Sequence, residues 1–134
     1  MRSMADKGVV EIIVDLGKYK YVELEASEAE RLLKEVTRRL GFESQDASET
    51  YRIIRNFDAF YDMAKKKFKD YIVPSKSMND MILGKVIVDK VKLVKEGDKR
   101  IVGIHFDRRI SEDTLAEILK NMGYQVSIKR LEIA

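Results

Sequence analysis

The sequence predicts an α+β fold, in which an antiparallel sheet of about five strands has three helices packed on one face. A hairpin pattern followed by a capped helix occurs twice, at 9–42 and at 85–124. A long amphipathic pattern at 47–72 separates the two units, and a last strand pattern follows at 125–133. The expected element order is therefore ββααββαβ, within a single domain that covers 1–134.

The composition limits the classes of function. The chain has 134 residues, a net charge of +3, 37% charged residues and no cysteine. It therefore contains no disulfide, zinc–thiolate site or thiol nucleophile. Abundant Lys and Glu predict a thermophilic source. We expect a cytoplasmic protein without a membrane partner, because no apolar run is long enough to span a bilayer and the first residues do not resemble a secretion signal.

The first unit begins with a half-buried strand. Apolar and polar residues alternate over 9–16, which indicates one apolar face. A three-residue turn starting at Gly17 places Val14 opposite Val22, so that the apolar faces of both strands agree. Ser27 then starts a helix, which is expected to end at the next glycine in the sequence.

The long helix is the largest predicted element. Asp46 and Glu49 form a capping signature, and neither Gly nor Pro interrupts the pattern before Pro74. The helix is therefore expected to cover 47–72 as one piece. Its apolar stripe consists of Ile53, Ile54, Phe57, Phe60, Tyr61, Ala64, Phe68 and Tyr71.

The second unit repeats the hairpin and the capped helix. A two-residue turn at Gly97 pairs Leu93 with Val102 and Asp89 with Phe106. The next helix begins after its cap, Ser111, and in the final strand the alternation slips between Ile128 and Leu131, which predicts a bulge. The two units suggest an internal duplication, although ordinary capping chemistry also produces such similarity.

The basic excess of the chain lies in 47–76. Such a density of cations suits the phosphates of DNA or RNA, and neighbouring aromatic rings suit unpaired bases. The alternative is a solvated helix face, in which Asp62 pairs with Lys66. The predicted nucleic-acid-binding residues are Arg52, Arg55, Lys65, Lys66, Lys67, Lys69 and Lys76.

Arg108 and Arg109 form a second, weaker candidate for anion binding. They precede the last helix, whose first N–H groups can also receive an anion. The alternative is a polar loop in which these arginines pair with Asp107, Glu112 or Asp113.

Catalytic and metal chemistry have little support in the sequence. His105 is the only histidine, and we expect it to be exposed on a strand opposite Lys90. Four acidic residues cluster near the first helix, without the spacing of a calcium loop. No phosphate-binding glycine motif occurs, so no cofactor is expected. The acidic residues are Glu23, Glu25, Glu28 and Glu30.

Two functions therefore compete. The first is a small nucleic-acid-binding or nucleic-acid-associated accessory protein that contacts phosphates through the basic helix. The second is a structural module that forms a homodimer or larger homo-oligomer through aromatic and Met residues of the long helix and of the segment around Met78 to Leu83, and that has no catalytic activity. An enzyme is a weaker third possibility. The locations of the aromatic and Met side chains discriminate between the first two functions: Tyr51, Phe60, Tyr61, Met63, Phe68 and Tyr71.

Overall fold

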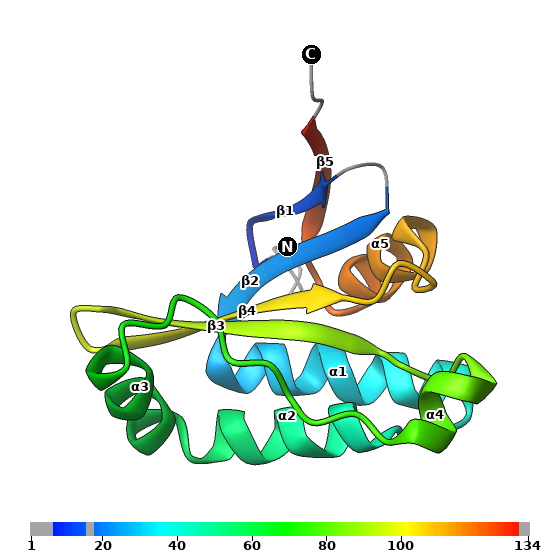
Figure 1. The fold of residues 1–134 in the computed structure, drawn as a ribbon. Coiled ribbons are helices and arrows are strands. Elements are labelled where there is room, and N and C mark those ends of the chain that lie inside the picture. Colours follow the sequence, from blue (N-terminus) through cyan, green and yellow to red (C-terminus); the bar gives the residue numbers. More distant parts are fainter. Residues whose placement is uncertain (1–6, 16–17, 132–134) are drawn as a thin grey trace.

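The computed structural model describes residues 7–15 and 18–131, and its fold is α+β (Figure 1). The elements, in chain order, are β1 (Val9–Asp15), β2 (Tyr19–Glu25), α1 (Ala26–Leu40), α2 (Gln45–Arg55), α3 (Phe57–Lys66), α4 (Met78–Leu83), β3 (Val88–Glu96), β4 (Lys99–Phe106), α5 (Glu112–Asn121) and β5 (Gln125–Leu131). The described residues thus form five helices, where the sequence predicted three. None of these helices has the length and apolar character needed to cross a bilayer.

The five strands form one sheet in the order β3-β4-β2-β1-β5. Neighbouring strands are antiparallel except for β1 and β5, which are parallel. The expected predominance of antiparallel pairing is therefore confirmed, and the sheet is a mixed one because of this single parallel pair. The parallel pair arises because α5 is a crossover that returns the chain in the direction of β4, which is also the direction of β1.

The helices that the structure describes cover one face of the sheet. Figure 1 shows α1 and α2 on the same side of the sheet. Helix α5 packs against β1, β5 and α1, and its side chains Leu115, Ile118 and Leu119 join the same core. The largest core side chains are fully buried, among them Phe106 and Leu33. Within the described part of the chain, no helical layer covers the second face of the sheet.

The first hairpin has a different register from the predicted one. Val14 lies opposite Lys20 instead of Val22. The two registers differ by two residues, which preserves the face on which each side chain lies, so the buried face is as expected. Residue 16 of the predicted strand and residue 17 of the predicted turn lie outside the described part of the chain.

The second hairpin agrees with the sequence except at its start. Leu93 pairs with Val102, and the two-residue turn is confirmed because Glu96 pairs with Lys99. An irregularity between Val88 and Lys90 places Val88, and not Asp89, opposite Phe106. The buried Val88 thereby remains on the core side.

The long helix predicted at 47–72 is wrong as a single element. It is divided at Asn56 into α2 and α3, and it ends at Lys66. At the break, the carbonyl of Arg52 accepts two hydrogen bonds from Asn56, one of 3.1 Å from its backbone N–H and one of 2.9 Å from its side chain. The change of direction also places Phe57 in the core.

Two predicted caps are also corrected. Helix α1 begins at Ala26, with Glu25 at its N-cap and no side-chain cap, so Ser27 lies inside the helix. Helix α2 is capped by Ser44, whose side chain accepts a bond of 3.3 Å from the N–H of Ala47. The cap at Ser111 is confirmed, because its hydroxyl accepts a hydrogen bond from the N–H of Thr114.

Asp46, predicted as part of a cap, instead connects α2 to the sheet. It is fully buried, with 0% exposure. Its Oδ2 atom accepts hydrogen bonds of 2.8 Å from the N–H of Ile87 and 2.6 Å from the N–H of Val88. The carboxylate therefore fixes the point at which β3 enters the sheet.

The last strand is more regular than predicted. Residues Val9–Asp15 pair one by one with Gln125–Leu131, so the described part of β5 has no bulge between Ile128 and Leu131. The remainder of the predicted strand, beyond Leu131, lies outside the described residues.

Candidate nucleic-acid interface

The predicted basic residues of α2 bond to neighbouring side chains. Arg52 donates hydrogen bonds of 3.2 and 2.6 Å to Glu49, and its guanidinium lies 5.1 Å from the ring centroid of Phe60. Hydrogen bonding to Arg52 lowers the pKa of Glu49. This ion pair compensates the charge of Arg52 within the protein.

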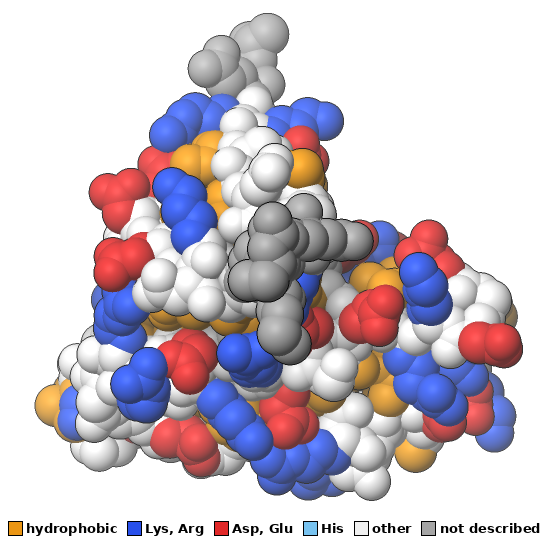
Figure 2. Space-filling model, turned by 180° about the vertical axis from the view of Figure 1, so that it is seen from behind, with side chains coloured by type: hydrophobic (Ala, Val, Ile, Leu, Met, Phe, Trp, Pro, Cys, Tyr) orange, Lys and Arg blue, Asp and Glu red, His pale blue; other side chains and the backbone are white. Residues whose placement is uncertain are grey.

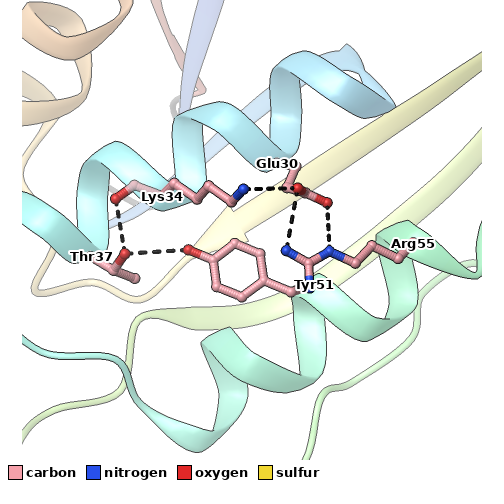
Figure 3. A network of polar contacts seen from close by, with 5 residues as sticks. All are labelled: Glu30, Lys34, Thr37, Tyr51 and Arg55. Atoms are coloured by element: carbon pink, nitrogen blue, oxygen red, sulfur yellow. Dashed lines mark hydrogen bonds and ion pairs between the residues drawn. The ribbon is translucent and has the colours of Figure 1, made fainter.

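Arg55 belongs to a polar network that joins α1 to α2 (Figure 3). It donates bonds of 3.1 and 3.4 Å to Glu30, which also pairs with Lys34. Burial alone would raise the pKa of Glu30, but the hydrogen bonds from Arg55 and Lys34 lower it below its ordinary value. Arg55 therefore links α2 to α1 through Glu30.

A pocket with a basic lining lies between the end of α3 and strand β3. It has a volume of about 310 Å³. Four lysines line it, together with a single carboxylate, that of Asp70. The four lysines come from two parts of the chain and are Lys65, Lys69, Lys92 and Lys95.

Tyr61 forms the aromatic part of this pocket. The Nζ atoms of Lys65 and Lys95 lie 5.4 and 4.8 Å from its ring centroid. Lys95 also lies 3.4 Å from Asp58, but Asp58 is held more closely by Arg100, at 2.8 Å. Hydrogen bonding to Arg100 lowers the pKa of Asp58 to about 2. Because Asp58 is paired more closely with Arg100, much of the positive charge of Lys95 remains available to another anion.

Helix α3 ends next to the pocket in a Schellman motif. The N–H of Lys69 donates to the carbonyl of Ala64 at 2.9 Å, and the N–H of Phe68 donates to the carbonyl of Lys65 at 3.2 Å. Phe68 occupies the left-handed position of this motif, with a φ of 53°, where glycine is usual. Its side chain is 96% exposed, so core packing does not account for a phenylalanine there.

Replacing Phe68 by glycine is expected to raise the free energy of unfolding by about 0.5–1 kcal/mol. Glycine adopts a positive φ without the steric cost that a Cβ atom imposes, and this gain exceeds its greater freedom in the unfolded chain. Urea unfolding followed by circular dichroism measures the difference. Phe68→Ala, which retains the Cβ atom, is the control and should show no gain. An unchanged or lowered stability of Phe68→Gly would contradict the assigned strain.

The seven predicted residues thus fall into two groups. Lys65 and Lys69 line the pocket, and Lys66 and Lys67 are exposed beside Phe68. Among the described residues, no ion pair involves Lys66, Lys67 or Lys69. The other three bond within the protein: Arg52 to Glu49, Arg55 to Glu30, and Lys76 to the carbonyl of Asp89.

Sequence reasoning missed the contribution of β3 to this surface. Lys92 and Lys95 belong to a hairpin that was considered apart from the basic helix. The alternation of Lys90 and Lys92 was a usable signal, because it places these two cations on the side of the strand away from the core, whereas Lys95 lies on the opposite side. What the sequence did not show is that Ile72 forms a bridge to Val91 and draws the end of α3 alongside β3.

Arg108 and Arg109, the weaker candidates, lie in the loop before α5. The Nη1 atom of Arg109 lies 3.4 Å from Asp107 Oδ2, which also accepts a hydrogen bond of 3.0 Å from the N–H of Arg109. The carbonyl of Arg108 accepts a hydrogen bond of 3.0 Å from Lys20 Nζ. The side chain of Arg109 is thus paired with Asp107, as in the alternative interpretation of a polar loop.

The predicted acidic cluster is dispersed. Glu23 accepts a hydrogen bond of 2.6 Å from Tyr21, whereas Glu28 binds Lys7 and Tyr124. Glu30 belongs to the network with Arg55. Over the described residues, no group of three His, Cys, Asp or Glu side chains has the geometry to hold a metal ion.

His105 is more enclosed than expected. Its ring lies 4.3 Å from that of Tyr21 and 5.1 Å from that of Tyr71, measured between centroids, and its pairing with Lys90 is confirmed. Burial, with a smaller effect of Lys90, lowers the pKa of His105 to about 4. The imidazole is therefore neutral at pH 7 and belongs to an aromatic cluster on the open sheet face.

The rear of the molecule has a mixed charge. Figure 2 shows basic and acidic side chains interspersed over this face. Opposite charges also pair directly on the helices, as in Arg38 with Glu35 and Arg39 with Glu117. A surface of alternating sign offers an anionic partner less attraction than the lysine-lined pocket.

Comparisons of the chain with protein-family models, with curated proteins and with solved structures gave no match. The molecule is therefore described by its architecture alone. It is an α+β protein in which the described helices leave one sheet face open, and a lysine-lined pocket lies beside that face. Its function has to be argued from that surface.

Proposed function

We propose that this protein is a small nucleic-acid-binding or nucleic-acid-associated accessory protein, which holds phosphates at the pocket between α3 and β3. The observation that carries this proposal is the convergence of Lys65 and Lys69 with Lys92 and Lys95 around one pocket. The exposed Phe68, between Lys67 and Lys69, adds an aromatic side chain that has no role in the core.

The chemistry of the pocket suits a phosphate chain better than a single small anion. Lysines act as mobile point charges, and a row of them neutralises successive phosphates without reading sequence. Lys66 and Lys67 continue the row outside the pocket. Both DNA and RNA supply this backbone.

Replacing the four pocket lysines by glutamine is the test. At about 50 mM salt the variant is expected to bind a labelled oligonucleotide about 100-fold more weakly than the unmodified protein. The slope of log affinity against log salt is expected to become shallower by about 3 units, because four contacts release about 0.7–0.9 counterion each. Fluorescence anisotropy across a salt series measures both quantities, with single-stranded and duplex probes.

The matched control removes four positive charges from other surfaces of the molecule. It is expected to retain most of the affinity, because net charge alone acts weakly and is screened by salt. Equal losses in the two variants, or no binding by the unmodified protein at the lowest salt, would contradict the proposal. The control positions are Arg31, Arg38, Arg39 and Lys120, each replaced by glutamine.

A second candidate function, that of a homo-oligomeric interaction module, is favoured by one part of the expected contact surface, the segment around Met78 to Leu83. Of the aromatic side chains of the predicted long helix that were to share this contact, Tyr51 is buried in this chain, and Phe60 and Tyr61 are partly buried. In contrast, α4 exposes Met78, Ile82 and Leu83, and Ile82 is 75% exposed. We propose a second copy of the chain as the partner of α4. A strictly monomeric mass in sedimentation at high concentration would contradict this.

A further inference from the structure

A row of side chains crosses the open face of the sheet. The register aligns Lys90 with His105, His105 with Tyr21, Tyr21 with Ile13, and Ile13 with Lys129. This face lies opposite the layer of α1, α2 and α5. The row therefore has lysines at both ends and rings near one end.

The rings form one contact group. His105 lies between Tyr21 and Tyr71, and the ring of Tyr71 meets it edge-on, with an interplanar angle of 80°. All three side chains are partly exposed. Gly103 makes room for this group, because a Cβ atom at that position would lie 2.0 Å from the hydroxyl oxygen of Tyr21.

This aromatic group is continuous with the basic pocket. Lys92 lines the pocket and also lies 6.0 Å from the ring centroid of Tyr71. Lys90 lies 4.2 Å from the same centroid. Lys69, on the pocket wall, is only two residues before Tyr71 in the chain. A polymer seated in the pocket thus meets Tyr71 as it leaves.

We propose that the ligand is a single-stranded nucleic acid. Its phosphates lie at the pocket, and its unpaired bases stack on Tyr71 and on the adjoining surface that His105 and Tyr21 form. This inference rests on the proposed function, since it needs the phosphate contacts of the pocket. Its own basis is chemical: bases within a duplex present only their edges, whereas unpaired bases present a face that stacks on aromatic side chains. A sheet with helices on one face and exposed rings on the other can bind two or three bases in this way.

The electrostatics of the row support stacking. His105 is uncharged at pH 7 because burial lowers its pKa to about 4. Lys90 and Lys92 lie next to the ring of Tyr71, Asp89 and Asp15 also act on His105, and Glu23 is engaged by the Tyr21 hydroxyl at 2.6 Å. Uncharged rings next to lysines suit a single-stranded nucleic acid, because its bases can stack on the rings while its phosphates contact the lysines.

The test replaces Tyr71 by leucine and compares oligothymidine, oligouridine and a duplex of equal length. Tyr71→Leu is expected to weaken binding to both single strands about 10-fold and to leave duplex binding within twofold, because one stacked base is lost. Tyr71→Phe retains the ring and is expected to bind within twofold of the unmodified protein. Tyr21→Leu, inside the sheet, provides a second variant with the same expected preference, and thermal melts establish that each variant is folded.

The outcomes separate the two proposals. If the pocket variant loses affinity for every probe while Tyr71→Leu and Tyr21→Leu bind single strands normally, the stacking inference is overturned and the phosphate proposal stands. Equal loss of single-strand and duplex affinity in Tyr71→Leu also overturns the inference. If the pocket variant binds as well as the unmodified protein, the phosphate proposal itself fails. Similar results with oligothymidine and oligouridine support recognition of bases and phosphates in either polymer.

Discussion

Replacing Asp46 by alanine is expected to lower the free energy of unfolding by about 3 kcal/mol. Alanine removes an acceptor that is shared by the N–H groups of Ile87 and Val88, both in the buried interior. Two buried donors are then left without a partner, at about 1–3 kcal/mol each, and relief from burying a charge offsets part of the loss. Urea unfolding at neutral pH, followed by circular dichroism, measures the change.

Asp46→Asn is the matched variant. Its amide oxygen can accept the same two hydrogen bonds, so it should lose less than half as much stability as the alanine variant. Equal losses in the two variants would show that the charge, rather than the acceptor, holds β3 in place. A loss below about 1 kcal/mol in Asp46→Ala would contradict the role assigned to the carboxylate.

Replacing Phe106 by alanine is expected to lower the free energy of unfolding by about 3–5 kcal/mol. The side chain has 0% exposure and lies at the end of β4, opposite Lys20 on one side and Val88 on the other. Alanine leaves a cavity that the surrounding strands and helices fill only in part. The midpoint of urea unfolding gives the change directly.

Phe106→Leu, which retains most of the apolar volume, is the control for the cavity. It should recover more than half of the stability that alanine loses, since the remaining cost comes from shape alone. A loss of less than about 1.5 kcal/mol in Phe106→Ala would mean that the core collapses around the site or that Phe106 is not packed as described.

The sequence predicted the fold class because alternation and turns are local signals. The register of the second hairpin follows from the two-residue turn, and the buried faces of both hairpins follow from the period of two. Strand order and the parallel pairing of β5 depend on how distant segments pack, which no local pattern specifies. The break at Asn56 was missed because the apolar pattern continues through it, while the side-chain hydrogen bond from Asn56 to the carbonyl of Arg52 is visible only in three dimensions.

The candidate site was predictable only in part. Lysines of the basic segment were identified by charge density, but density does not distinguish Arg55, which bonds to Glu30, from Lys69, which lines the pocket. That distinction depends on which carboxylates the fold brings near each cation. The positive φ of Phe68 was also hidden, because its position in the apolar stripe suggested a buried residue.

The parallel pairing of β1 with β5 has a consequence for synthesis of the chain. Val9 pairs with Gln125, so the edge of a strand made at the start acquires its neighbour only when residues 125–131 have left the ribosome. Until then the growing chain presents an unpaired strand edge, to which other chains can add. Pairing between such distant segments is also slow, because a long loop has to close first. The sheet is therefore expected to be completed only after residues 125–131 have been synthesised, and until then the nascent protein depends on its charged surface to remain free of aggregation.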